Sequence, residues 1–249
     1  MNASATDETR ASEYFSIPEN EVFPLAERFF LRAAGFDLGT EKHSRMYADA
    51  LAVRDEGIQG VRVEGFVAEY GAEVYDGEAV AVGVERVSAV VFERIPPESV
   101  ERVVLYVITA GECSCDKDDD IMSRLYAHMW GTAYVDAGRV ILEGRIRERV
   151  LAELKAEGVP GSRLSPAFSP GFYGMDNRDS RAIVNLLGAD EIGVSCVETG
   201  VMLPVKTCSG VFLVTYGSVD LPGEECLVCS GNRSGCAHCM VANRSILNV

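Results

Sequence analysis

Residues 61–92, VRVEGFVAEYGAEVYDGEAVAVGVERVSAVVF, set the class of fold that the chain can adopt. The stretch is rich in valine, and its apolar side chains alternate with polar or small ones, which is the period of a strand with one buried face. The dipeptide Asp76-Gly77 lies where a hairpin would turn, because both residues accept the dihedral angles of tight turns. We therefore expect two or three antiparallel strands here.

A buried strand and a long helix are expected on the C-terminal side of this stretch. The run 103–109 is almost continuously apolar. From about residue 121 to 157 the pattern is helical; the acidic run 116–120 supplies capping groups for its start, and Gly158 and Pro160 end it. The expected core stripe of this helix consists of Ile121, Leu125, Met129, Ala133, Val140 and Leu151.

The remaining segments complete a mixed architecture. Helical spacing also appears at 24–36, 42–57 and 179–190, whereas 162–176 is rich in proline and glycine and is expected to be a loop. We expect an α+β fold in which a twisted antiparallel β-sheet, a meander, packs with helices that include one long central helix. Further strands are expected at 192–197, 201–205 and 208–217.

The composition excludes several classes of partner. The chain has 249 residues, with 23 Lys and Arg against 38 Asp and Glu and a formal charge of −15, and no window is basic enough to grip a phosphate backbone. No apolar stretch approaches the ~18 residues that a membrane helix needs, and the first twenty residues lack the pattern of a signal peptide. We therefore expect no nucleic acid, no membrane and a cytoplasmic location.

Half of the eight cysteines lie close together near the C-terminus, in CLVCSGNRSGCAHC. Two CxxC pairs can place four thiolates on one metal, which suits tetrahedral zinc or an iron–sulfur cluster, with a [4Fe–4S] cluster slightly favoured. Disulfides or free thiols are the alternative. The expected organisation is a flexible tail over 1–20, one α+β domain over 21–220 and a metal-binding appendage over 221–249. The expected ligands are Cys226, Cys229, Cys236 and Cys239.

The other four cysteines carry weaker signals. Cys113 and Cys115 lie beside the acidic run, where they could bind metal or be reactive, although two ordinary loop cysteines explain the pattern as well. Cys196 and Cys208 fall in apolar strand patterns and are expected to be core thiols. His128, on the long helix, is expected to be a packed or surface residue rather than a catalyst.

Three further segments resemble a known family. RLYAHMWGTAYVDAG (124–138), SPAFSPGFYGMD (165–176) and GVSCVETGVMLPVKTCSGVFLV (193–214) are similar, in order and in several residues, to motifs of the activation (reactivation) domain of cobalamin-dependent methionine synthase in its small stand-alone form. The resemblance covers roughly residues 100–217. In that family a Pro-Gly-Tyr turn after an arginine lines the S-adenosylmethionine site. The matching residues here are Pro170, Gly171, Phe172 and Tyr173, with Arg163 as the nearest arginine but farther upstream than in the family.

Two carboxylates extend the resemblance. Glu198 matches a later family motif, which continues through Met202, Pro204, Ser209 and Gly210, and Asp136 stands where the family usually has glutamate. A carboxylate can hold the ammonium or the ribose hydroxyls of such a ligand through charge-assisted hydrogen bonds. For both residues an ordinary surface role remains open.

The resemblance implies reductive reactivation of a corrinoid (cobalamin) methyltransferase, with S-adenosylmethionine presented to the cobalt of a partner protein. The implied partners are a corrinoid-binding methyltransferase or short-form methionine synthase and a low-potential electron donor. An iron–sulfur cluster at the four cysteines would offer an electron route within the chain. The alternatives are a non-catalytic corrinoid-protein binding module with a structural zinc site, or a separate iron–sulfur redox protein.

Overall fold

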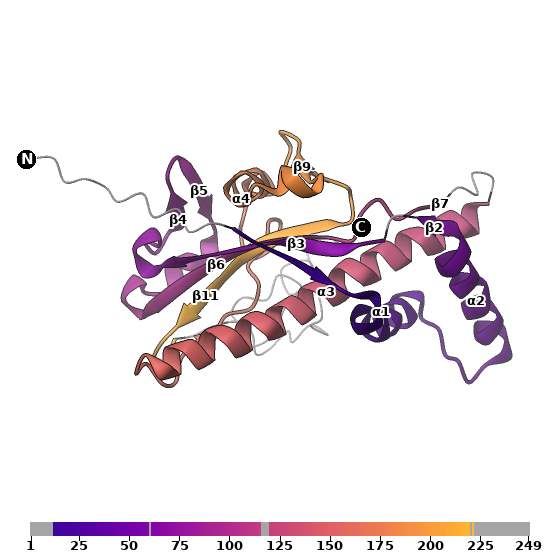
Figure 1. The fold of residues 1–249 in the computed structure, drawn as a ribbon, viewed down its shortest axis with the longest axis horizontal. Coiled ribbons are helices and arrows are strands. Elements are labelled where there is room, and N and C mark those ends of the chain that lie inside the picture. Colours follow the sequence, from indigo (N-terminus) through magenta and orange to yellow (C-terminus); the bar gives the residue numbers. More distant parts are fainter. Residues whose placement is uncertain (1–11, 60, 116–119, 220, 222–249) are drawn as a thin grey trace, which may run out of the picture.

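The computed structural model describes residues 12–59, 61–115, 120–219 and 221, so the four C-terminal cysteines lie outside the described residues. A five-stranded antiparallel sheet forms the centre of the domain (Figure 1). Its four longer strands lie side by side in the same order as they occur along the chain. The α+β class, with an antiparallel sheet and one long helix, is therefore confirmed. In sheet order the strands are β1 (Glu13–Ile17), β3 (Val63–Gly71), β6 (Val100–Thr109), β11 (Thr207–Thr215) and β8 (Arg163–Leu164).

Strand β1 lies inside the stretch 1–20 that the sequence predicts as a flexible tail. It pairs with β3 from Glu13↔Val67 to Ile17↔Val63, and Ile17 is buried. The prediction is therefore wrong for residues 13–17. The polar composition of the stretch hides a strand that pairs only with a distant part of the chain and that buries little beyond its last residue.

The stretch 61–92 forms three strands, as expected: β3, β4 (Ala79–Val82) and β5 (Glu85–Ser88). Asp76 does form a tight turn, in which its Oδ1 accepts hydrogen bonds from the backbone N–H groups of Glu78 and Ala79 at 2.9 and 2.7 Å. That turn comes before β4, whereas the β4–β5 hairpin turns at Gly83, which has a φ of +58°.

Helices and short strands cover both faces of the sheet (Figure 1). One face packs against α1 (Glu19–Ala34) and α3 (Ile121–Ala156), and the other against α4 (Asp179–Leu187) and the β4–β5 hairpin. The predicted helix 42–57 is α2 (Glu41–Ala52) followed by a π-helical turn (Val53–Gly57). The remaining strands are two-residue pairs: β2 (Ile58–Gln59) with β7 (Ser114–Cys115), and β9 (Ser195–Cys196) with β10 (Met202–Leu203).

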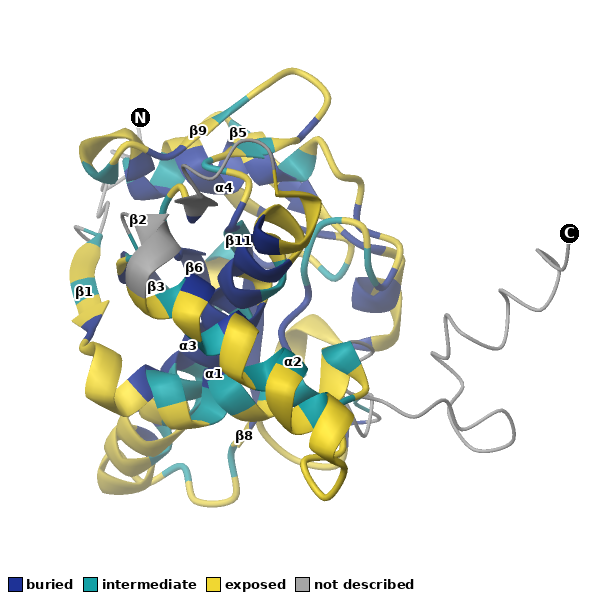
Figure 2. Cartoon of the chain, turned by 90° about the vertical axis from the view of Figure 1, so that its right-hand side faces the viewer, coloured by how far each residue is buried: buried dark blue, intermediate teal, exposed yellow. Residues whose placement is uncertain are grey.

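Helix α3 starts and ends close to the predicted positions, but its buried face differs from the predicted stripe. The carboxylate of Asp120 caps it by accepting from the backbone N–H of Met122 at 3.0 Å. Ile121 and Leu125 are 73% and 46% exposed, so the prediction is wrong for both. In Figure 2 buried residues line α3 where it meets the sheet and α1. They include Tyr126, Trp130, Ala133, Tyr134, Ala137, Leu142, Ile146, Val150 and Leu154.

No helix in the described part of the chain is both long and apolar enough to cross a membrane. Helix α3 has the length, with 36 residues, but charged side chains recur along it.

Candidate functional site

The Pro170–Tyr173 turn lies against the edge of β11. Phe168 exchanges both backbone hydrogen bonds with Val211 at 2.8 Å, which fixes the loop to the strand. The turn then closes as the backbone N–H of Phe172 donates to the carbonyl of Ser169 at 2.9 Å. Gly171 and Tyr173 both have positive φ, +86° and +55°, and Tyr173 is a rare case for a bulky residue. The loop thus has one defined course past the strand.

The aromatic residues of this loop differ in exposure. Phe168 is fully buried, and the Tyr173 ring packs edge-on against it at a centroid distance of 5.1 Å. Tyr173 is itself only 5% exposed, within the core on the α4 side of the sheet. Phe172 is half-buried. Of the two aromatic residues predicted for the site, Phe172 is therefore the one whose ring remains partly open to a ligand.

The turn that carries Glu198 meets the Pro170–Tyr173 turn at Asn177. A methyl group on Gly200 would lie 2.0 Å from the backbone oxygen of Asn177, and one on Gly171 would lie 2.7 Å from its side-chain oxygen. Gly200, which meets backbone atoms, is therefore needed for this close approach, and Gly171 is favoured by its positive φ. Glu198 itself is exposed, in a turn closed by the hydrogen bond from Gly200 N–H to the carbonyl of Val197 at 2.9 Å.

A third motif glycine, Gly210, allows the loop to lie directly on β11. A methyl group there would come within 2.7 Å of the Phe168 carbonyl oxygen and 2.8 Å of Ser169 Oγ. Ser169 Oγ also lies 3.1 Å from the hydroxyl of Tyr106 on the neighbouring strand. The structure therefore brings the second and third motif segments together along the edge of the sheet.

Arg163 lies away from this assembly. It belongs to β8 and pairs with Thr215, at the C-terminal end of β11, and its guanidinium donates to the carbonyl of Val219 at 2.7 Å. Thr215 is five residues from Gly210, which is about 17 Å along an extended strand. The turn and the arginine that the sequence analysis grouped are thus separated in the fold.

Asp136 lies on α3, next to a buried lysine that the sequence analysis did not single out. Lys206 is 8% exposed, and its Nζ lies 2.8 Å from Thr132 Oγ1 and 3.0 Å from His128 Nδ1. Its backbone is fixed to the sheet, because its carbonyl accepts from the N–H of Ala110 at 2.8 Å. The signal in the sequence is the single charge in the otherwise uncharged segment VMLPVKTCSGVFLV.

Charges and burial compete around Lys206. Burial lowers the pKa of the Lys206 ammonium, while the thiolate form of Cys113 and the carboxylate of Asp136 act to raise it. Burial also lowers the pKa of His128, and the positive charge of Lys206 lowers it further. The Lys206 ammonium therefore interacts with the nearby carboxylate of Asp136, while the neutral form of His128 is favoured.

Cys113 packs beside Lys206 as a protonated thiol. Burial raises its pKa to about 11, which opposes formation of the reactive thiolate, and its Sγ donates to the carbonyl of Ala110 at 3.3 Å. A methyl group on Gly131 would meet both Cys113 and Lys206, so this glycine allows α3 to approach. Cys196 and Cys208 are half-buried, and no cluster of His, Cys, Asp and Glu in the described ranges could hold a metal.

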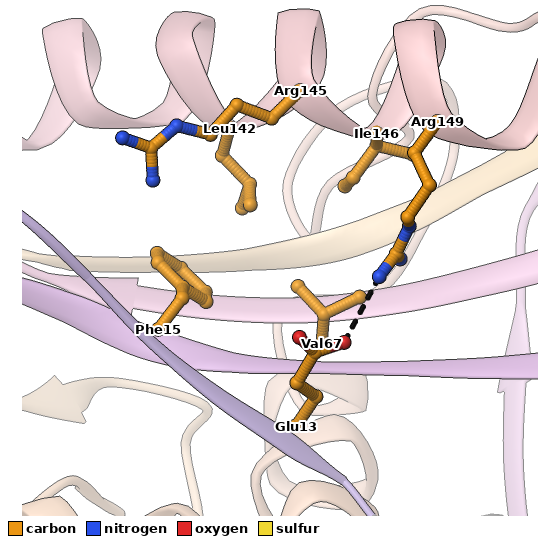
Figure 3. Close-up of a pocket in the computed structure, with 7 residues that line it drawn as sticks. All are labelled: Glu13, Phe15, Val67, Leu142, Arg145, Ile146 and Arg149. Atoms are coloured by element: carbon orange, nitrogen blue, oxygen red, sulfur yellow. Dashed lines mark hydrogen bonds and ion pairs between the residues drawn. The ribbon is translucent and has the colours of Figure 1, made fainter.

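A separate cavity of about 160 Å³ lies between α3 and strands β1 and β3 (Figure 3). The apolar part of its lining is Phe15, Val67, Leu142 and Ile146. Arg145 and Arg149 also line it; Arg149 forms a 2.9 Å ion pair with Glu13, and Arg145 bonds Glu21 at 2.6 Å. Because glutamates already neutralise both arginines, the cavity offers little to an anion.

The fold and the turns define an α+β domain with a candidate ligand site along one edge of a curled antiparallel sheet. No protein-family model and no curated protein sequence matches the chain. Among solved structures it is similar to the MetH reactivation domain bound to AdoHcy, with a TM-score of 0.59, 12% identity and coverage of 84% of this chain and 80% of that one. The fold implied by the motifs is confirmed by this likeness, which at such low identity concerns the fold alone.

Proposed function

We propose that this protein binds S-adenosylmethionine and serves in the reductive reactivation of a corrinoid methyltransferase. The observation that carries the proposal is the meeting of the Pro170–Tyr173 turn and the Glu198 turn at Asn177, on a fold similar to a reactivation domain that binds AdoHcy. S-Adenosylmethionine would supply the methyl group for the cobalt of the partner. The work of this chain would be to orient that ligand and to exclude water.

Residues of the two turns and of α3 suit such a ligand chemically. Glu198 and Asp136 offer carboxylates for hydroxyl or ammonium groups, and Phe172 offers an aromatic face for a base. The glycine backbone of the turn lets a ligand approach closely. Because Arg163 bonds the carbonyl of Val219 at the far end of β11, we do not assign it to this ligand.

Binding of AdoHcy is the direct test. We expect titration calorimetry to show saturable binding of AdoHcy to the full chain, and Glu198→Gln to weaken it by about tenfold, the order of one charge-assisted hydrogen bond. Glu41→Gln, an exposed carboxylate on α2, is the matched control and should leave affinity unchanged. Absence of binding by the unmodified protein would contradict the proposal.

We also propose that Cys226, Cys229, Cys236 and Cys239 bind an iron–sulfur cluster or zinc, and that an iron–sulfur cluster would relay an electron to the site. Protein prepared anaerobically is expected to contain iron and acid-labile sulfide, with an EPR signal after reduction by dithionite. Cys229→Ser should remove the metal and leave AdoHcy affinity unchanged, because the proposed site lies in the described domain. Stoichiometric zinc without iron would rule out the electron relay, and absence of both metals would rule out the site.

The placement of Arg163 favours one second candidate, a corrinoid-protein binding module that does not use S-adenosylmethionine. In that case the unmodified protein would bind a corrinoid-binding methyltransferase or short-form methionine synthase but show no heat with AdoHcy. In either case the partner carries the cobalamin and the proposed location is the cytoplasm. A low-potential electron donor is required only for reactivation.

A further inference from the structure

One face of α3 carries polar side chains at 128, 132 and 136, which are four residues apart and therefore lie above one another. The Nζ of Lys206 lies within 3.0 Å of groups on the first two, His128 and Thr132. Asp136 is one turn further along, and its negative charge acts on Lys206. A buried cation and a half-buried carboxylate are thus close enough for their charges to interact.

The same side of β11 is contacted by Ser169, the residue that begins the turn of the candidate site. Side chains alternate along a strand, so positions 206, 208, 210 and 212 point to one face, which is the α3 face because Cys208 and Phe212 pack in that core. Gly210, where Ser169 contacts the strand, is four residues from Lys206, or about 13 Å. Lys206, Asp136 and the contact of the loop with Gly210 therefore lie along one side of one strand.

We propose that Lys206 and Asp136 form a clamp for the α-amino-acid end of the ligand, with Lys206 donating to the carboxylate and Asp136 accepting from the ammonium. The inference rests on the proposed function and names the part of the ligand that this pair recognises. An amino-acid zwitterion presents one negative and one positive group side by side, and the pair presents the complementary charges. The two side chains stabilise each other by charge attraction.

The position of Lys206 suits this role better than that of Arg163. Lys206 is more than nine-tenths buried, and its amine is held by Thr132 and His128. Arg163 is exposed and already donates to two backbone carbonyls, those of Gly217 and Val219. Charge-assisted hydrogen bonds are about twice as strong as neutral ones, so loss of the lysine should cost measurable affinity.

The test compares AdoHcy with 5′-methylthioadenosine, which keeps the adenosine and the thioether but lacks the amino-acid end. We expect Lys206→Met to weaken AdoHcy binding by about tenfold or more and to leave the affinity for 5′-methylthioadenosine within about twofold. Asp136→Asn, at a half-buried helix position, should show the same selectivity. Lys155→Met, an exposed lysine in the last turn of α3, is the matched control and should alter neither affinity.

The outcomes separate the clamp from the proposed function. Equal weakening of both ligands by Lys206→Met and Asp136→Asn would mean that these side chains act only through the fold, and it would overturn the clamp. Unchanged AdoHcy affinity in both variants would also overturn it, while the proposed function would stand. If the unmodified protein binds neither ligand, the proposed function fails and the clamp fails with it.

Discussion

Replacing Gly200 by alanine is expected to lower the free energy of unfolding by about 3 kcal/mol and to abolish AdoHcy binding. The residue has a φ of +89°, which alanine adopts only with strain, and the added methyl would lie 2.0 Å from the backbone oxygen of Asn177. The two turns would therefore have to separate. Urea unfolding followed by circular dichroism measures the stability, and calorimetry measures the binding.

Gly193→Ala is the matched control for this variant. Gly193 has a similar φ of +76°, but a methyl there would meet no atom within 4 Å. It should therefore lose only the backbone contribution, about 1–2 kcal/mol, and keep AdoHcy binding. Equal losses of stability and binding in the two variants would show that the contact with Asn177 does not position the Glu198 turn.

Replacing Trp130 by alanine is expected to lower the free energy of unfolding by about 4 kcal/mol. The indole is fully buried, stacks on Phe30 at a centroid distance of 4.0 Å and donates from Nε1 to the carbonyl of Ala50 at 2.8 Å. Its removal would leave a cavity between α1 and α3 and would remove one of the hydrogen bonds that the Ala50 carbonyl on α2 accepts. Urea unfolding followed by circular dichroism is again the measurement.

Two further variants serve as comparisons for the loss of stability in Trp130→Ala. Trp130→Phe keeps an aromatic ring against Phe30 but loses the hydrogen bond to Ala50, so a smaller loss of about 1–2 kcal/mol is expected. Val84→Ala, at a side chain that is 99% exposed, should change stability by less than about 0.5 kcal/mol. A loss for Trp130→Ala no larger than that for Val84→Ala would contradict the assigned role of the α1–α3 contact.

Local chemistry made parts of this fold predictable from the sequence. Helix α3 has a capping aspartate at Asp120 and a glycine at Gly158 with a φ of +88°, and the predicted ends follow from these two residues. Strand β6 is predictable because it is buried on both faces and is therefore apolar throughout its inner part. In both cases the signal lies within the element itself.

The predictions that the structure contradicts concern contacts between segments that are distant in the sequence. Ile121 and Leu125 fit a helical period, but the first turns of α3 extend beyond the sheet, so the period alone does not show that these side chains stay exposed (Figure 1). Strand β1 is stabilised by its pairing with β3 and by ion pairs such as Glu13 with Arg149, which no local pattern predicts.

The candidate site was predictable as motifs but not as an arrangement. The glycines of the turns are visible in the sequence, whereas their shared contact, Asn177, has no feature that distinguishes it from a surface residue. The grouping of Arg163 with the turn followed from their proximity along the chain. In the fold, pairing of β8 with the far end of β11 separates them.

The pocket between α3 and strands β1 and β3 has a consequence for local opening of the domain. It leaves about 160 Å³ between the helix and the sheet that no side chain fills, at the place where β1 forms the edge of the sheet. Strand β1 is mostly exposed, and beyond its pairing with β3 it is joined to α3 by ion pairs such as Glu13 with Arg149. We therefore expect the amide hydrogens of β1 to exchange with solvent sooner than those of the buried strand β6.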